Sequence, residues 1–117
     1  MLIAGFRMMY SFPKKLRLIK KEQFREVFKT PEKRLTTEAF RIYYCVNDLT
    51  YPRLGIVVAK KNFKKAVSRN YFKRIVREFF RLNQNKIGTI DLVVLVNKKA
   101  GDLAREELDQ QLHKAFR

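Results

Sequence analysis

The feature that most constrains this chain is a basic segment, residues 60–81, whose composition and periodicity predict an amphipathic helix. It holds nine Lys or Arg against one acid, Glu78, so that its net charge of +8, in 22 of the 117 residues, is half of the chain's +16. Like charges at this density repel one another unless a polyanion binds them. The segment therefore indicates a surface for an anionic partner, for which nucleic acid is the obvious candidate.

The part of this segment from Ala66 to Asn83 has two faces when it is wound as a helix at about 100° per residue. One face is apolar and is expected to pack on a core; it consists of Val67, Tyr71, Phe72, Ile75, Val76, Phe79 and Leu82. The opposite face carries Arg69, Asn70, Lys73, Arg74, Arg77 and Arg81, with Phe80 at its edge. Cations four residues apart repel each other, and almost no acid relieves them here. This face is therefore better explained as a phosphate-binding surface than as a solubilising one.

Composition predicts one globular domain. The chain is 46% apolar and includes ten Phe and five Tyr, enough for one core. We take residues 1–11 as an N-terminal extension and residues 12–117 as a single RNA-binding α+β domain. Met8 or Met9, within the extension, is a candidate for the true first residue of the protein. No segment has the roughly 18 apolar residues of a membrane span, and the first twelve residues lack the features of a signal peptide. We expect no membrane partner and a cytoplasmic location.

The predicted elements follow the order αββαβα, which indicates a sandwich of helices on a small sheet. Residues 40–46 alternate between apolar and other side chains, and a turn then leads into residues 53–59; this predicts an antiparallel hairpin. Residues 91–96 form an unbroken apolar run after Asp91, which is typical of a strand buried on both faces. The expected helices are residues 20–29, the basic helix and a last helix that follows Gly101.

The first predicted strand carries Arg41 and Tyr43 on one side, where a ligand could lie. The adjacent strand would place mostly small residues beside them: Arg53, Gly55, Val57 and Ala59. An exposed ring in such a trough stacks on any base for about 1–3 kcal/mol. From the pattern alone, an ordinary half-buried strand tyrosine is nevertheless the better explanation of Tyr43. Phe24 and Phe28, four residues apart on a short helix, are likewise better explained as core residues.

Catalytic constellations are nearly absent from the sequence. The single histidine, His113, falls near the end of the last helix, and the acids are scattered without a spacing that would hold two metals. There is no phosphate-binding glycine loop or nucleophile elbow. The lone Cys45 excludes an internal disulfide and a multi-cysteine metal site. We expect no catalytic or metal-ligating residues in the chain itself.

Residues 66–78 resemble the signature of the bacterial ribonuclease P protein component family. They read AVSRNYFKRIVRE, against the family pattern A-x-x-R-N-x-x-K-R-x-x-R-E. Residues 53–61 (RLGIVVAKK) are similar to the strand that enters this helix, and the likeness extends more loosely from Arg17 to Phe116. The chain departs from the family in its first ten residues and at Lys64-Lys65, where many relatives have a glycine-containing turn.

The resemblance implies a fold and a role. The fold is an α+β sandwich with a small mixed sheet and an unusual left-handed βαβ crossover. The role is that of the protein subunit of ribonuclease P, which joins a catalytic RNA subunit that removes the 5′ leader from precursor tRNA with Mg²⁺ bound mainly by the RNA. By this likeness the RNA subunit would be bound by Arg69, Asn70, Lys73, Arg74 and Arg77. The single-stranded leader would be bound by Phe24, Phe28, Tyr43, Lys60 and Lys61.

Three other hypotheses fit the basic helix. A general or ribosomal RNA-binding protein would use it on many structured RNAs. A helix-turn-helix protein would place it in the major groove of DNA, although the sequence predicts no paired helix just before Ala66. A stand-alone nuclease would cleave precursor tRNA without an RNA subunit. We expect RNA, and not DNA, as the partner.

Overall fold

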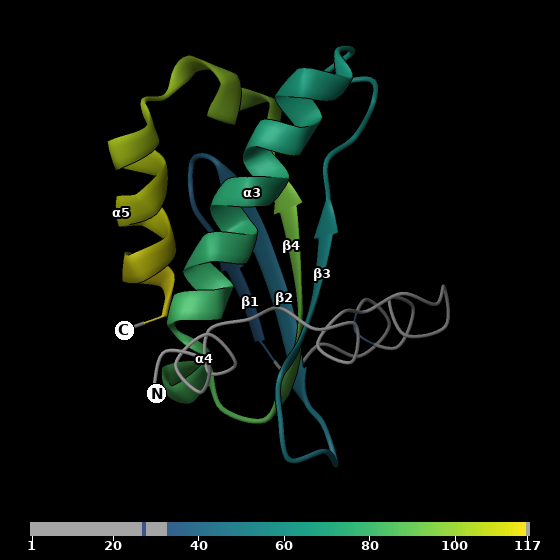
Figure 1. Cartoon of the computed structure of the whole chain (residues 1–117), viewed down its shortest axis with the longest axis vertical. Coiled ribbons are helices and arrows are strands. Elements are labelled where there is room, and N and C mark those ends of the chain that lie inside the picture. The colour runs from purple at the N-terminus through teal and green to yellow at the C-terminus, as the bar shows by residue number, and fades with distance from the viewer. Residues whose placement is uncertain (1–26, 28–32, 117) are drawn as a thin grey trace, which may run out of the picture.

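The computed structural model describes Val27 and residues 33–116, which fold into a sheet with helices packed on one face (Figure 1). In chain order, the described elements are β1 (Lys33–Thr36), β2 (Phe40–Val46), β3 (Arg53–Val57), α3 (Ala66–Leu82), α4 (Gln84–Ile87), β4 (Ile90–Val96), η2 (Lys98–Asp102) and α5 (Arg105–Ala115). None of the helices within these residues combines the length and the hydropathy needed to cross a membrane. This is a mixed α+β domain, as the sequence predicted.

Strand β4 lies at the centre of the sheet, whose order is β1-β2-β4-β3. It pairs antiparallel with β2 and parallel with β3. Leu92, Val93 and Val94 are each at most 1% exposed, because the helices cover one face of β4 and Val27 packs on the other. The burial on both faces that the apolar run predicted is confirmed.

The predicted hairpin between residues 40–46 and 53–59 is wrong, because β4 lies between β2 and β3. The turn between these two strands therefore crosses the end of β4. Asn47 fixes this crossing: its backbone N–H donates to the carbonyl of Thr89 at 3.1 Å, and its side-chain amide donates to the carbonyl of Tyr51 at 3.2 Å. The edge strand β1 was not predicted, since its sequence KRLT is short and mostly charged.

The β3–α3–β4 connection is a left-handed crossover. In Figure 1 the parallel strands β3 and β4 point upward, α3 lies on the viewer's side of them, and the chain passes from β3 on the right to β4 on the left. Nearly all parallel crossovers in proteins have the opposite hand. The left-handed connection that the family resemblance implied is therefore present.

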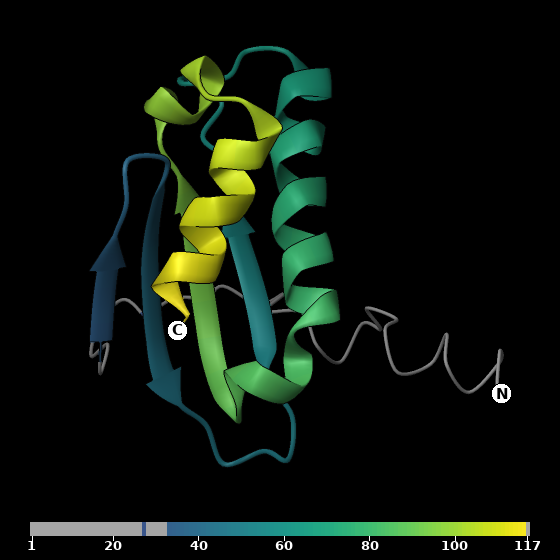
Figure 2. The same ribbon diagram turned by 90° about the vertical axis from the view of Figure 1, so that its left-hand side faces the viewer.

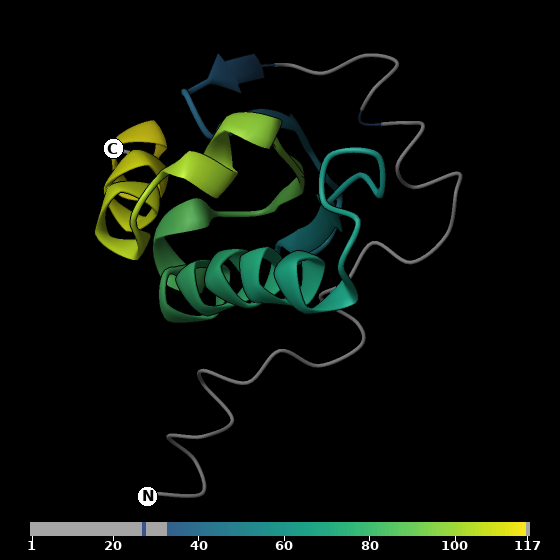
Figure 3. The same cartoon turned by 90° about the horizontal axis from the view of Figure 1, so that it is seen from above.

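Helices α3 and α5 cover the same face of the sheet (Figure 2), and the view from above shows both helices on one side of the strands (Figure 3). The core between them is built from alternate residues of β2 and β4 and from the inner side of the helices. Its largest fully buried side chains on this face are Phe40, Phe80, Ile42, Ile75, Leu92, Leu108 and Leu112. The sheet thus leaves its other face for Tyr43 and its neighbours.

Helix α3 buries a different arc from the one predicted. Four residues expected to face the core do so: Phe72, Ile75, Val76 and Phe79. Phe80, expected at the edge of the cationic face, is 0% exposed, whereas three residues expected to face the core are exposed: Val67 at 79%, Leu82 at 56% and Tyr71 at 42%. The buried arc is therefore shifted around the helix toward Phe80. The opposite edge of the predicted apolar face, which carries Val67, Tyr71 and Leu82, faces solvent along the whole length of α3.

Candidate nucleic-acid interface

The outer face of α3 presents polar and cationic side chains to solvent. Asn70, Arg74 and Arg77 are exposed, and Lys73 is partly exposed. The single acid of the helix, Glu78, is engaged by Arg105, and this hydrogen bond raises the pKa of the Arg105 guanidinium. Within residues 33–116, none of the α3 cations forms an ion pair. The face predicted from the helical periodicity thus offers positive charge that the described part of the protein does not neutralise.

Arg69 differs from the other cations of this face. Its Nη1 donates to the carbonyl oxygens of Phe63, at 2.8 Å, and of Lys64, at 2.9 Å. These two carbonyls belong to the loop that enters α3. The guanidinium therefore turns back toward its own chain, which the periodicity of the helix could not indicate.

The loop between β3 and α3 carries the predicted rim lysines, Lys60 and Lys61, and both are exposed. Phe63 anchors the loop: it is 9% exposed, and its ring centroid lies 4.6 Å from that of Phe72. Lys64 and Lys65 follow, also exposed. The loop thus holds four lysines in solvent at the start of the cationic helix. A helix-turn-helix motif would need a second helix just before α3, and β3 and this loop contain none.

Tyr43 lies on the face of the sheet opposite the helices. The register places it in a row with Val93 of β4 and Gly55 of β3. The predicted trough is therefore wider than expected, because β4 inserts its own residues between the two strands. Tyr43 is partly exposed, and the guanidinium carbon of Arg34 lies 5.9 Å from the centre of its ring. Val27 also packs on this side, against Val93.

Two of the predicted leader-binding residues, Phe24 and Phe28, lie outside the described residues. Of the five predicted, the structure therefore describes Tyr43, Lys60 and Lys61. The tyrosine lies within a strand and the lysines lie in the loop that follows β3.

Arg53, expected in the trough, is held by an internal ion pair. Its Nε and Nη2 donate to the two carboxylate oxygens of Asp91 at 2.8 and 2.6 Å. This hydrogen bonding raises the pKa of the Arg53 guanidinium. Asp91 is 6% exposed and also accepts from the side chain of Asn47 at 2.9 Å. Arg53 thus joins β3 to β4. Sequence reasoning missed this pair because it predicted β2 as the partner of β3 and gave no register for β4.

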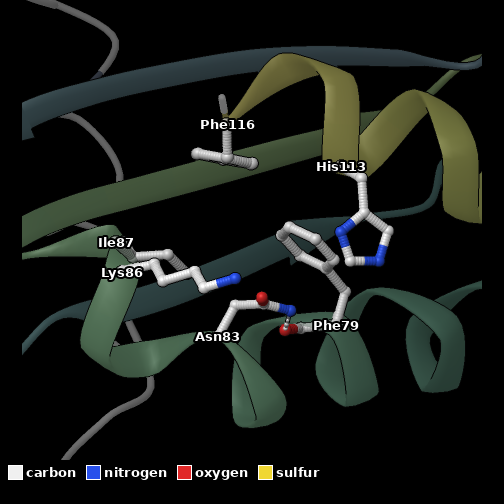
Figure 4. A pocket seen from close by; sticks show the side chains of 6 residues that line it. All are labelled: Phe79, Asn83, Lys86, Ile87, His113 and Phe116. Atoms are coloured by element: carbon white, nitrogen blue, oxygen red, sulfur yellow. Dashed lines mark hydrogen bonds between the residues drawn. The ribbon is translucent and has the colours of Figure 1, made fainter.

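A small pocket between the C-terminal ends of α3 and α5 was also missed by sequence reasoning (Figure 4). It is lined by Phe79, Asn83, Lys86, Ile87, His113 and Phe116. The ring of Phe79 packs edge-on against His113, with centroids 5.0 Å apart, and lies 5.5 Å from Phe116. His113 therefore contributes to the packing of α5 on α3.

The described residues contain no group of three or more His, Cys, Asp or Glu side chains that could hold a metal ion. Their acids are either exposed and dispersed or committed to arginines, as Asp91 and Glu78 are. The chemistry that this surface supports is the binding of an anionic polymer.

Comparisons with known proteins agree with this chemistry. The family model described as Ribonuclease P matches residues 12–117. The chain is similar to the ribonuclease P protein component of Proteus mirabilis (strain HI4320), at 40% identity over 107 residues that cover 92% of this chain and 89% of that protein. It is similar to that of Vibrio cholerae, at 43% identity with 92% and 90% covered. Among solved structures, it resembles the RNase P protein from Thermotoga maritima, with a TM-score of 0.76, 35% identity, and 86% and 94% of the two chains covered.

Proposed function

The chain belongs to the ribonuclease P protein family, whose members form part of the ribonucleoprotein endoribonuclease of tRNA processing, and from this we propose how its surface is used. The outer face of α3 docks on the catalytic RNA subunit through Asn70, Lys73, Arg74 and Arg77, with Arg69 at its start. A second region binds the single-stranded 5′ leader of precursor tRNA through Tyr43, Lys60, Lys61, Phe24 and Phe28.

The observation that carries the first half of this proposal is the uncompensated charge of α3. A rigid helix that presents several cations neutralises phosphates brought together by a folded RNA, with little loss of side-chain freedom. Arginine is suited to bidentate contacts with phosphate, and Asn70 can donate to the backbone or to a base edge. If about five cations meet phosphates, the logarithm of the affinity falls with the logarithm of the salt concentration at a slope of about −4.

The second half of the proposal is supported by the chemistry of Tyr43 and the loop lysines. A partly exposed ring stacks on a base whatever its identity, and neighbouring lysines attract the backbone. A leader whose sequence differs between precursors needs this kind of tolerant binding. The two regions together would let the protein hold the RNA subunit and the substrate at once, in the cytoplasm.

Mg²⁺ is proposed to be held mainly by RNA. The carboxylates of the described residues do not gather into a cage of oxygen ligands, which is what a divalent hard cation needs. Phosphate oxygens of the RNA supply such ligands. We therefore assign no protein side chain to the cleavage step.

The experiment that tests this function is purification of the protein from its own cells followed by sequencing of the RNA that accompanies it. A single dominant RNA of a few hundred nucleotides, which cleaves precursor tRNA with Mg²⁺ faster when the protein is added, is the expected result. A spread of ribosomal fragments would contradict it and favour a general RNA-binding protein. Cleavage by the RNA-free protein would contradict the assignment of the chemistry to RNA.

A further inference from the structure

We infer that Arg69 is a positioning residue, which holds the lysine loop (residues 60–65) at the start of α3. The functional consequence rests on the proposed function, because the lysines of this loop are proposed to meet the leader. Arg69 would then act on the leader through Lys60 and Lys61.

The geometry of the guanidinium supports this role. A single nitrogen, Nη1, donates to two consecutive carbonyl oxygens, those of Phe63 and Lys64, at 2.8 and 2.9 Å. Hydrogen bonds from a charged donor are about twice as strong as neutral ones. The backbone N–H of Arg69 also donates to the carbonyl of Lys65 at 3.2 Å. Arg69 thus contacts three successive residues of the chain that enters the helix.

The lysine loop needs such a clamp, because its own side chains repel one another. Its four lysines are all exposed, and the loop forms no strand or helix. Inside it, the backbone N–H groups of Asn62 and Phe63 donate to the carbonyl of Ala59, each at 3.1 Å. On the apolar side the ring of Phe63 packs on Phe72 and contacts Gly101, where an added Cβ would lie 3.3 Å from it. The side chain of Phe63 thus fixes the loop by packing, and the side chain of Arg69 fixes it through hydrogen bonds to the backbone carbonyls of the loop.

The other arginines of the face differ from Arg69 in this respect. Within residues 33–116, Arg74 and Arg77 form neither ion pairs nor hydrogen bonds through their side chains, and both are exposed. Their charge faces outward, where an RNA would lie. Arg74 is therefore a matched control: it is the same residue type on the same helix, without a contact to the loop.

Amide hydrogen exchange of the free protein tests the inference without RNA. In Arg69→Ala the amides of Asn62 and Phe63 should exchange about tenfold faster or more, since the loop loses two charge-assisted hydrogen bonds. Arg74→Ala should leave both rates unchanged, and Arg69→Lys should restore part of the protection. Unchanged rates at Asn62 and Phe63 in Arg69→Ala would overturn the inference. Core amides of β4 report whether the variant remains folded.

A double-mutant cycle separates positioning from direct contact. The protein is assembled with its co-purified RNA, and its binding to precursor tRNA is compared with binding to the same tRNA without a leader. Arg69→Ala should reduce the preference for the leader several-fold in the native background, and by less than about twofold when Lys60→Ala and Lys61→Ala are already present. Equal losses in both backgrounds would overturn the inference. If the lysine changes alone leave the preference intact, the proposed leader contact fails, whereas the exchange rates still decide whether Arg69 holds the loop.

Discussion

Asp91 is the one buried charged residue among those described, and its partners explain why it is tolerated there. It accepts three hydrogen bonds, two from Arg53 and one from Asn47. The pKa of the Arg53 guanidinium is raised in the folded protein. Its contribution to stability is therefore fully present below its unfolded pKa, which lies far above neutral pH, and is lost only as pH rises through the higher folded value. Titration of Arg53 therefore causes no pH dependence of stability between pH 6 and 9.

Removing Asp91 should destabilise the protein strongly. Asp91→Ala leaves Arg53 charged and without its partner, which we expect to lower the free energy of unfolding by about 2–4 kcal/mol, less than for a fully buried pair because Arg53 is partly solvated. The measurement is urea denaturation. Asp102→Ala, at an exposed acid of η2, is the control and should change stability by less than about 0.5 kcal/mol. Equal stabilities of the two variants would contradict the structural role of the pair.

At the scale of single residues, the sequence predicted which side chains of α3 would be cationic and exposed, but it did not separate Arg69 from Arg74. Both fall on the same arc of the helix. Their difference arises from the path of the preceding loop, which brings the carbonyls of Phe63 and Lys64 within reach of Arg69 alone. Periodicity describes a helix without its surroundings, and it therefore contains no information on such contacts.

At the scale of the element, the apolar arc of α3 was wider than the surface available to bury it. The buried side chains of α3 lie on the side of Phe72 and Phe80, whereas the opposite edge of the apolar arc is exposed, at 79% for Val67, 42% for Tyr71 and 56% for Leu82. The exposed Val67 and Tyr71 line a shallow depression with Asn70 and Arg74. A helical wheel shows which residues share a face, but the length and position of the neighbouring helix decide how much of that face is covered.

Adjacent aromatic residues of α3 test this arrangement. Phe72→Ala should lower the free energy of unfolding by about 3–4 kcal/mol, because it removes a buried ring that packs on Phe63. Tyr71→Ala should cost less than about 1 kcal/mol, since the ring is 42% exposed. Both changes have the same effect on helix propensity, so chemical denaturation of the two variants compares burial alone. A larger loss from Tyr71→Ala would show that the helix is rotated relative to the structure described here.

Strands β2, β3 and β4 were placed nearly correctly along the sequence, but β1 was missed and one pairing was wrong. Two strands joined by a short turn usually pair, which favoured a hairpin of residues 40–46 with residues 53–59. The run from Leu92 to Val96 carried the opposing signal, because a strand buried on both faces belongs in the middle of a sheet. The ion pair between Arg53 and Asp91 holds that inserted strand at one end. Neither the short turn nor the apolar run is by itself enough to choose between a hairpin and an inserted strand. The pairing of β4 with both β2 and β3, which are distant from it in the sequence, decides the strand order.

At the scale of the whole molecule, the two proposed binding regions lie on different parts of the surface. Helix α3 covers one face of the sheet, whereas Tyr43 belongs to the other face, with the lysine loop between the end of β3 and the start of α3. Docking on the RNA subunit and binding of the leader are therefore expected to be separable by mutation.

Tyr43→Ala tests this separation. Loss of a stacking ring worth about 1–3 kcal/mol should weaken binding of precursor tRNA by about 5- to 150-fold relative to tRNA without a leader. Assembly with the RNA subunit should not change. Phe24 lies outside the described residues; Phe24→Ala is likewise expected to weaken binding of precursor tRNA and to leave assembly with the RNA subunit unchanged. Tyr43→Phe is the matched control and should keep the preference for the leader, since the ring remains. A loss of assembly in Tyr43→Ala would show that the two surfaces are not independent.

The most direct test of the account is the salt dependence of binding between the protein and its co-purified RNA, compared for the native chain and for Arg74→Gln with Arg77→Gln. If the outer face of α3 meets phosphates, the double variant should bind more weakly, and the steepness of the salt slope should fall by about 1.5 from a native value of about 4. Lys98→Gln with Lys99→Gln removes the same charge from η2 and should leave the slope nearly unchanged. An affinity and a slope in the α3 variant equal to those of the native protein would contradict the assignment of this helix as the RNA-docking surface.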